Sequence, residues 1–309
     1  MKKINKILIV LILMLFVSLL TGCTNDDEKV DVYASIYPVY YLAKNIAGEK
    51  LTVRQVYPNG ADVHEYDPIS DGDMKSLVKM NDAKLMLYLN DNLEAFIKSA
   101  KNSVFKGSDI KLVELTESIR LYDAVTEEYE ITDEHSTNAD LHIWLDPTMM
   151  MKVAKIIEKE LVAIDSENEL YYETNLNELI DTLDKIDRKY QEELSKFEFK
   201  TMLVDHDAYL YLAKRYGITR IKSRIDNESC DISASHMIEV IEQARELDIK
   251  YIVVTRNESV CSSVETFNSE LGCEIVYLDP ISTLTKETED SDFYELMISN
   301  LYVLKKIFR

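Results

Sequence analysis

Glycine and basic residues are scarce in this sequence, and each shortage argues against a class of function. Only 7 of the 309 residues are glycine, and neither G-x-G-x-x-G nor G-x-x-x-x-G-K-[ST] occurs. This argues against a nucleotide site built on a glycine-rich phosphate loop. The 35 basic residues are outnumbered by 56 acidic ones, which gives a formal net charge of -21. Because phosphate neutralisation requires a basic surface, we expect no nucleic-acid partner.

The amino terminus has the organisation of an export signal. Three lysines within the first six residues precede an apolar run over residues 7–20, which is too short to span a bilayer comfortably. Residues 20–23 (LTGC) resemble the bacterial lipobox, whose cysteine, here Cys23, is lipidated and becomes the first mature residue. We expect a lipoprotein signal peptide over 1–22 and a lipidated tether over 23–29, so that acyl chains hold the protein outside the cytoplasm. An uncleaved anchor and an ordinary signal peptide are the alternatives.

Three further cysteines follow the lipobox cysteine: Cys230, Cys261 and Cys273. None of them lies in a C-x-x-C pair, which argues against a thiolate zinc cluster. Cys261 and Cys273 flank one predicted helix and could form a disulfide, since an extracytoplasmic compartment permits one. The alternative is that they are small buried residues.

Strand and helix patterns alternate along most of the chain, which predicts an α/β protein with parallel sheets. The expected strands cover residues 30–36, 52–57, 84–89, 110–115, 200–204, 219–222, 251–255 and 274–278. The expected helices cover residues 39–47, 74–80, 93–100, 150–161, 166–195, 208–216, 235–247, 264–271 and 293–308.

One predicted helix is unusually long and organises the domains. Neither glycine nor proline occurs from Thr148 to Tyr216, and apolar residues between Leu176 and Leu194 recur at helical spacing. At 1.5 Å per residue, a helix over 166–195 would be about 45 Å long and could run beside two domains. We therefore expect the following division: an amino-terminal α/β lobe over 30–164, a linking helix over 165–198 and a carboxy-terminal α/β lobe over 199–309.

An acidic segment interrupts the first lobe. Residues 121–151 contain eight acidic residues and no lysine or arginine, and the part over 123–140 shows little periodicity. We expect a mobile acidic loop over 123–140, with one histidine, His135, in it.

Three histidines and one aspartate lie where ligands bind in α/β proteins, beyond the carboxyl ends of strands. His64 follows a predicted strand through a Pro-Asn-Gly turn, His206 ends another, and Asp279 ends the last one, while His142 closes the acidic loop. Three imidazoles and a carboxylate suit a divalent transition metal such as zinc. The four residues are widely spaced and form no local metal motif, so each histidine taken singly also fits an ordinary surface or core position.

Five segments, taken together and in order, resemble the zinc- and manganese-binding solute receptors of bacterial ABC importers. They are residues 32–38 (VYASIYP), 58–68 (PNGADVHEYDP), 142–147 (HIWLDP), 206–213 (HDAYLYLA) and 277–280 (YLDP). The resemblance implies two Rossmann-like lobes with parallel sheets, joined by one long rigid backbone helix, with the metal site in the cleft between the lobes.

The resemblance also implies the ligands. His64 and His142 match the two histidines of the family's first lobe, and Asp279 matches the carboxylate of the second. His206 matches a ligand that is histidine in zinc receptors and glutamate in manganese receptors, so it favours zinc. Zinc receptors usually have a histidine-rich loop before the second ligand, whereas this loop contains only His135.

The function that the resemblance implies is capture and delivery of an ion, without catalysis. We expect a monomeric, lipid-anchored, extracytoplasmic receptor that binds Zn²⁺ with high affinity and delivers it to the permease and ATPase of an ABC transporter. Zinc affinity should fall below about pH 6 as the histidines become protonated. Glu65, Asp67 and Asp146 are candidates to orient the imidazoles, although exposed or helix-capping carboxylates would have the same pattern.

Other functions remain open at this point. The nearest is a manganese or broad-specificity metal receptor. A secreted zinc hydrolase is a second alternative, because three ligands with an open fourth position suit catalysis and Glu65 could then act as a base. A surface adhesin is a third, supported only by the lipid tether.

Overall fold

The computed structural model describes residues 29–70, 74–130, 138–224, 230, 232–256 and 260–309. The expected signal peptide, the lipidation site Cys23, the tether before Lys29 and His135 lie outside these ranges. Within the described part of the chain, no helix is long and apolar enough to cross a membrane.

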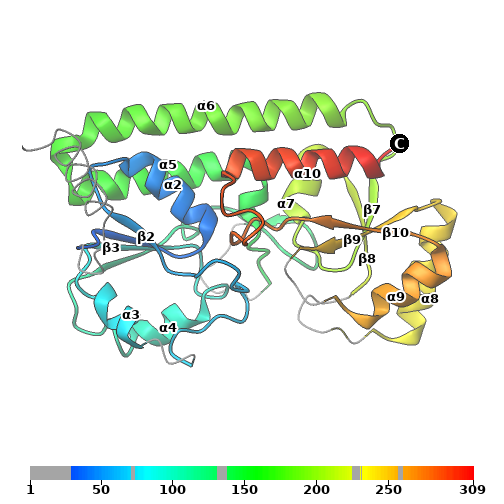
Figure 1. Cartoon of the computed structure of the whole chain (residues 1–309), viewed down its shortest axis with the longest axis horizontal. Helices are drawn as coiled ribbons and strands as arrows, with labels where there is room; N and C mark the ends of the chain where they lie inside the picture. The colour runs from blue at the N-terminus through cyan, green and yellow to red at the C-terminus, as the bar shows by residue number, and fades with distance from the viewer. Residues whose placement is uncertain (1–28, 71–73, 131–137, 225–229, 231, 257–259) are drawn as a thin grey trace, which may run out of the picture.

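Two four-stranded parallel sheets form the centres of two lobes (Figure 1). The first has the order β2-β1-β3-β4 and contains β1 (Val32–Ala34), β2 (Val53–Gln55), β3 (Leu85–Tyr88) and β4 (Lys111–Glu114). The second has the order β10-β9-β7-β8 and contains β7 (Thr201–Val204), β8 (Thr219–Lys222), β9 (Tyr251–Thr255) and β10 (Glu274–Leu278). All four residues of β3 are buried, as expected for a strand covered by helices on both faces.

Helices connect the strands and cover the sheets. In the first lobe they are α2 (Tyr37–Ala47), α3 (Met74–Met80), α4 (Ala95–Lys101) and α5 (Pro147–Ile164), with the 3₁₀ helix η1 (Ile143–Leu145) before α5. The 3₁₀ helix η2 (Ser166–Asn168) leads into α6 (Glu169–Leu194). In the second lobe they are α7 (Leu210–Tyr216), α8 (Ala234–Glu246), α9 (Ser262–Leu271) and α10 (Phe293–Ile307). The predicted α/β class with two parallel sheets is confirmed.

Helix α6 is the predicted long helix, and it runs along one side of both lobes (Figure 1). It packs against α2 and α5 of the first lobe and against α7 and α10 of the second. Asn175 donates to the carbonyl of Ile46 in α2 at 3.0 Å, and the Tyr190 hydroxyl donates to the carbonyl of Met297 in α10 at 2.5 Å. These contacts attach the one helix to both lobes.

An ion pair between the buried Asp187 and the partly exposed Arg215 adds to the attachment of α6 to the second lobe. The two carboxylate oxygens of Asp187 accept from Nε and Nη2 of Arg215 in α7, at 2.8 and 2.6 Å. The Tyr216 hydroxyl donates to the same carboxylate at 3.1 Å. Because hydrogen-bonded pairs of this kind require one geometry, they fix α7, and with it the residues before α7, relative to the long helix.

The described part of the acidic segment contains a hairpin where we expected a mobile loop over 123–140, and residues 131–137 of that loop lie outside the described ranges. Strands β5 (Leu121–Tyr122) and β6 (Tyr129–Glu130) pair antiparallel, and the chain continues along β5 again at residues 138–140. Two-residue strands are too short to produce a periodic pattern, which is why the sequence did not reveal them.

The disulfide considered possible between Cys261 and Cys273 is not formed, and Cys273 instead fits the alternative of a small buried residue. Cys261 is bonded to Cys230, with the two Cα atoms 5.4 Å apart, and Cys273 is a buried thiol that donates to the carbonyl of Ile249. Helix α9 separates Cys261 from Cys273 by 10 helical residues, or about 15 Å of rise, whereas a disulfide requires Cα atoms within about 7 Å.

Candidate metal centre

Three of the four predicted ligands meet in one place. Their ring centroids are 5.6 Å apart for His64 and His142, 5.8 Å for His64 and His206, and 5.6 Å for His142 and His206. Each offers one ring nitrogen, and these three nitrogens lie within 4.8 Å of one another. In a tetrahedral zinc site with Zn–N bonds of about 2.1 Å the nitrogens are about 3.4 Å apart, so small ring movements would complete the geometry.

His64 is the exposed member of the group, and its loop is fixed by the second lobe. The loop begins at Gly60, which has φ 83 and therefore a conformation that favours glycine. The Gly60 N–H donates to the carbonyl of Leu284 at 2.7 Å and to the hydroxyl of Thr283 at 3.0 Å. Asp62 then accepts the backbone N–H of His64 at 2.8 Å.

His142 is buried and is held by a carboxylate. One oxygen of Asp140 accepts the backbone N–H of His142 at 2.9 Å and lies 3.3 Å from its Nδ1. A carboxylate at Nδ1 favours the tautomer that leaves Nε2 available as a metal ligand. Trp144 is also buried, with its ring centroid 5.2 Å from that of His142, and its indole N–H donates to the carbonyl of Pro280 at 2.6 Å. The segment that carries His142 thus contacts both the core and the second lobe.

His206 is buried two residues after the end of β7, between two acidic residues that each have an arginine partner. Arg224 donates from Nε to the carbonyl of Asp205 at 2.9 Å and places Nη2 at 3.7 Å from its carboxylate. Arg220 forms an ion pair with Asp207. Both carboxylates are buried, so without these arginines their negative charge would be unfavourable here.

Asp279 lies outside the group formed by the three histidines. One of its carboxylate oxygens accepts the N–H of Ile281 at 2.8 Å, and the other lies 3.8 Å from Nε of Arg256. Burial raises the pKa of Asp279, and this effect is partly offset by the Ile281 N–H and the positive charge of Arg256. The role of Asp279 as a metal ligand stays a prediction.

The candidates for orienting the imidazoles have other contacts. Asp146 caps α5 by accepting the N–H and the hydroxyl of Thr148, both at 2.7 Å. Asp67 accepts the N–H of Ile69 at 2.8 Å and the hydroxyl of Ser70 at 2.7 Å. Glu65 is exposed.

The carboxylate beside His142 was missed by the sequence analysis, although a local signal existed. The spacing Asp-x-His occurs at Asp62–His64 and again at Asp140–His142, and in both cases the aspartate accepts the backbone N–H of the histidine. This short turn fixes the local backbone before each histidine.

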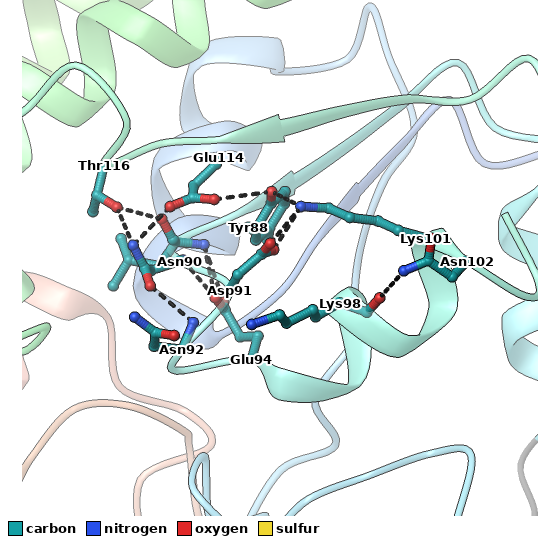
Figure 2. Close-up of polar contacts among 11 residues, drawn as sticks. Tyr88, Asn90, Asp91, Asn92, Glu94, Lys98, Lys101, Asn102, Glu114 and Thr116 are labelled. Atoms are coloured by element: carbon teal, nitrogen blue, oxygen red, sulfur yellow. Dashed lines mark hydrogen bonds and ion pairs between the residues drawn. The ribbon is translucent and has the colours of Figure 1, made fainter. Parts of the chain in front are cut away.

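A second polar cluster lies at the carboxyl ends of β3 and β4, and its groups bind one another (Figure 2). Lys101 donates to both carboxylate oxygens of Asp91, at 2.6 and 2.8 Å, and to the Tyr88 hydroxyl at 2.6 Å. Asn90 donates to Glu114 at 2.7 Å. Because a lysine and an amide hold these carboxylates, we interpret the cluster as support for the loops after the strands.

Comparison with known proteins identifies the family. Residues 32–307 match the family described as ZnuA, zinc-uptake complex component A, periplasmic. The chain is 30% identical over 289 residues to the high-affinity zinc uptake system protein ZnuA of Bacillus subtilis, covering 91% of this chain and 88% of that protein. It is 28% identical over 315 aligned positions to the zinc-binding lipoprotein AdcA of Streptococcus pneumoniae (strain ATCC BAA-255 / R6), covering 99% of this chain but only 61% of AdcA.

Solved structures agree with the sequence comparison. The Zn(II)-bound ZnuA-like domain of Streptococcus pneumoniae AdcA superimposes with a TM-score of 0.73 at 26% identity, covering 91% of this chain and 99% of the domain. The metal-dependent lipoprotein YcdH from Bacillus subtilis gives a TM-score of 0.73 at 28% identity, with the same coverage. This chain therefore belongs to the family of zinc-uptake complex component A, ZnuA.

Proposed function

We propose that this protein is an extracytoplasmic receptor that captures Zn²⁺ between its lobes and delivers it to the permease of an ABC transporter. The observation that carries the proposal is the convergence of three ring nitrogens within 4.8 Å, from His64 and His142 on one lobe and His206 on the other. A site shared by two lobes suits reversible capture, because separation of the lobes would remove a ligand.

The ligand chemistry favours zinc. Imidazole is a ligand that zinc accepts readily, whereas manganese prefers carboxylate, carbonyl and water oxygens. We assign the fourth position to Asp279, whose carboxylate would turn from Arg256 to the ion. The burial of Asp279 supports the assignment, because a bound cation would offset the free-energy cost of a buried negative charge.

The proposal also covers the cellular location of the protein and its partners. We propose that Cys23 carries a lipid anchor in the cell membrane and that the receptor acts as a monomer with the permease and ATPase of its transporter. The family description as an uptake component supports the transporter partners, and the lipoprotein AdcA among the relatives supports the lipid anchor. In this proposal the protein does not turn over a substrate, and Glu65 has no catalytic role.

Zinc binding by the purified protein tests the proposal. We expect one zinc ion per chain, weaker competition by manganese in calorimetry, and no hydrolysis of peptides or esters. His206→Ala should weaken zinc binding by about 100-fold or more, since loss of a ligand should exceed the 10- to 100-fold effect of losing an orienting partner. His236→Ala, in α8 and outside the group, is the matched control.

Each failure of this experiment has a distinct meaning. Unchanged zinc affinity in His206→Ala would contradict the ligand assignment. Equal competition by manganese would contradict the selectivity. Hydrolysis that disappears in Glu65→Gln would replace the receptor with an enzyme.

A further inference from the structure

The hairpin formed by β5 and β6 contacts the segments before and after the metal-binding histidines. We propose that this hairpin is a brace between the lobes that positions His142 against His206 before the ion arrives, with Tyr211 and Glu127 as its positioning residues. The inference rests on the proposed function, because it concerns the same three-histidine site.

Tyr211 makes the first connection. It lies in α7, which starts four residues after His206, and its side chain is 1% exposed. Its hydroxyl accepts the N–H of Tyr122 in β5 at 2.9 Å and donates to the carbonyl of Asp140 at 3.0 Å. Asp140 in turn holds His142. One hydroxyl therefore joins the helix that follows one ligand to the residue that orients another.

The backbone of the hairpin continues this connection. The N–H of Asp140 donates to the carbonyl of Tyr122 at 2.9 Å, and the N–H of Ala124 donates to the carbonyl of Asn138 at 2.7 Å. The rings of Tyr122 and Tyr211 meet edge to face with centroids 5.2 Å apart. The segment that leads to His142 is thus paired with β5, and β5 is fixed to α7.

Glu127, at the tip of the hairpin, makes the second connection. Its carboxylate lies 2.5 Å from Nη2 of Arg220, 3.0 Å from Nζ of Lys214 and 3.4 Å from Nζ of Lys222, all in the second lobe. Burial alone would raise the pKa of Glu127, but the hydrogen bond from Lys214 and the three positive charges lower it overall. The backbone of Glu127 has φ 56, an uncommon conformation for a residue with a side chain.

The cations that bind Glu127 also bind the residue next to a metal ligand. Arg220, whose side chain is 3% exposed, forms an ion pair with Asp207, and Lys222 lies 3.5 Å from the same carboxylate. Asp207 directly follows His206. The hairpin tip is therefore connected through Arg220 to the backbone that carries His206.

These two connections reach the site from opposite ends of the hairpin. One leads through Tyr211 and Asp140 to His142, and the other leads from Glu127 through Arg220 to His206. A site whose ligands already face one another loses less conformational entropy on binding, and its affinity is correspondingly higher. The brace should therefore raise zinc affinity although none of its residues contacts the ion.

Two substitutions in the full-length protein test the brace. Tyr211→Phe removes the bridging hydroxyl, and Glu127→Gln removes the charge at the hairpin tip. Glu128→Gln is the matched control, since it makes the same change of charge at the neighbouring, exposed position. Zinc affinity is measured by competition with a chromophoric chelator at low salt. We expect Tyr211→Phe and Glu127→Gln each to weaken binding by about tenfold, as for other groups that orient metal-binding histidines, and Glu128→Gln to leave it unchanged.

The salt dependence separates positioning from general damage to the fold. At 1 M salt the Debye length is about 3 Å, which screens the pairs of Glu127 with the partly exposed Lys214 and Lys222 but screens the pair with the buried Arg220 much less. The deficit of Glu127→Gln should therefore become smaller at 1 M salt without vanishing, while the deficit of Tyr211→Phe persists. Affinities of both variants equal to that of Glu128→Gln would overturn the brace, and so would a Glu127→Gln deficit independent of salt. If none of these proteins binds zinc, the wild type included, the result would instead contradict the proposed function.

Discussion

The buried carboxyl group of Glu94 makes the stability of the first lobe depend on pH. The residue precedes α4 and is 0% exposed, and its carboxylate accepts the N–H of Leu89 at 3.0 and 3.1 Å and that of Asn90 at 2.8 Å (Figure 2). Burial in a medium of low polarity is the main cause that raises the pKa of Glu94 from 4.5 to about 7, although hydrogen bonds from its neighbours lower it.

The sign of the effect follows from proton binding. Because the folded protein holds the Glu94 proton more tightly than the unfolded chain does, unfolding releases a proton between about pH 4.5 and 7. The contribution to the free energy of unfolding is complete below pH 4.5 and is lost as the pH rises through about 7. The pKa difference, from 4.5 to about 7, is about 2.5 units. At about 1.4 kcal/mol per unit, ionisation of Glu94 lowers the free energy of unfolding by at most about 3 kcal/mol.

Urea unfolding of the metal-free protein and of Glu94→Gln, at pH 5 and pH 8, measures this contribution. Glutamine cannot ionise, so the difference in free energy of unfolding between the two proteins should change by up to about 3 kcal/mol in favour of the variant as the pH rises. Glu117→Gln, at an exposed position, is the matched control and should show no such change. A difference between wild type and Glu94→Gln that stays constant across this range would refute the reasoning.

Three further substitutions have expected outcomes. Asp140→Asn removes the charge beside His142 Nδ1 and should weaken zinc binding by about 10- to 100-fold in competition calorimetry; an unchanged affinity would contradict its orienting role. Asp187→Asn leaves the partly buried Arg215 without its carboxylate and should lower the free energy of unfolding by about 2 kcal/mol in urea, whereas no loss would show that the pair does not attach α6. Cys230→Ser removes the disulfide between two residues 31 positions apart and should lower the free energy of unfolding by about 3 kcal/mol, because the disulfide restricts the unfolded chain. A variant as stable as the wild type would contradict this stabilising role.

Most of the fold could be predicted because its signals are local. Helices α7 and α9 end where the sequence indicated, at Gly217 and Gly272, and both glycines have φ 66 as left-handed helix caps. The buried stripe of α6, from Leu176 to Leu194, is visible as helical spacing in the sequence. Each of these features is set by neighbouring residues along the chain.

The features that the sequence did not reveal depend on distant residues. The strands of the hairpin have two residues each, and β5 and the turn are held by Tyr211 and Lys214, which lie in another lobe. The partner of Cys261 is Cys230, 31 residues earlier in the chain, and the fold brings the two together in a way that cysteine spacing does not reveal. The meeting of the three histidines could be expected from strand ends and from family resemblance, but the separate position of Asp279 beside Arg256 could not.

The location of bound zinc in a crystal of the zinc-loaded protein tests the central claim most directly. Data collected on both sides of the zinc absorption edge should show one anomalous peak at about 2.1 Å from a ring nitrogen of each of His64, His142 and His206. A zinc-loaded crystal with its anomalous peak elsewhere, or with the three imidazoles turned away from a common centre, would contradict the claim.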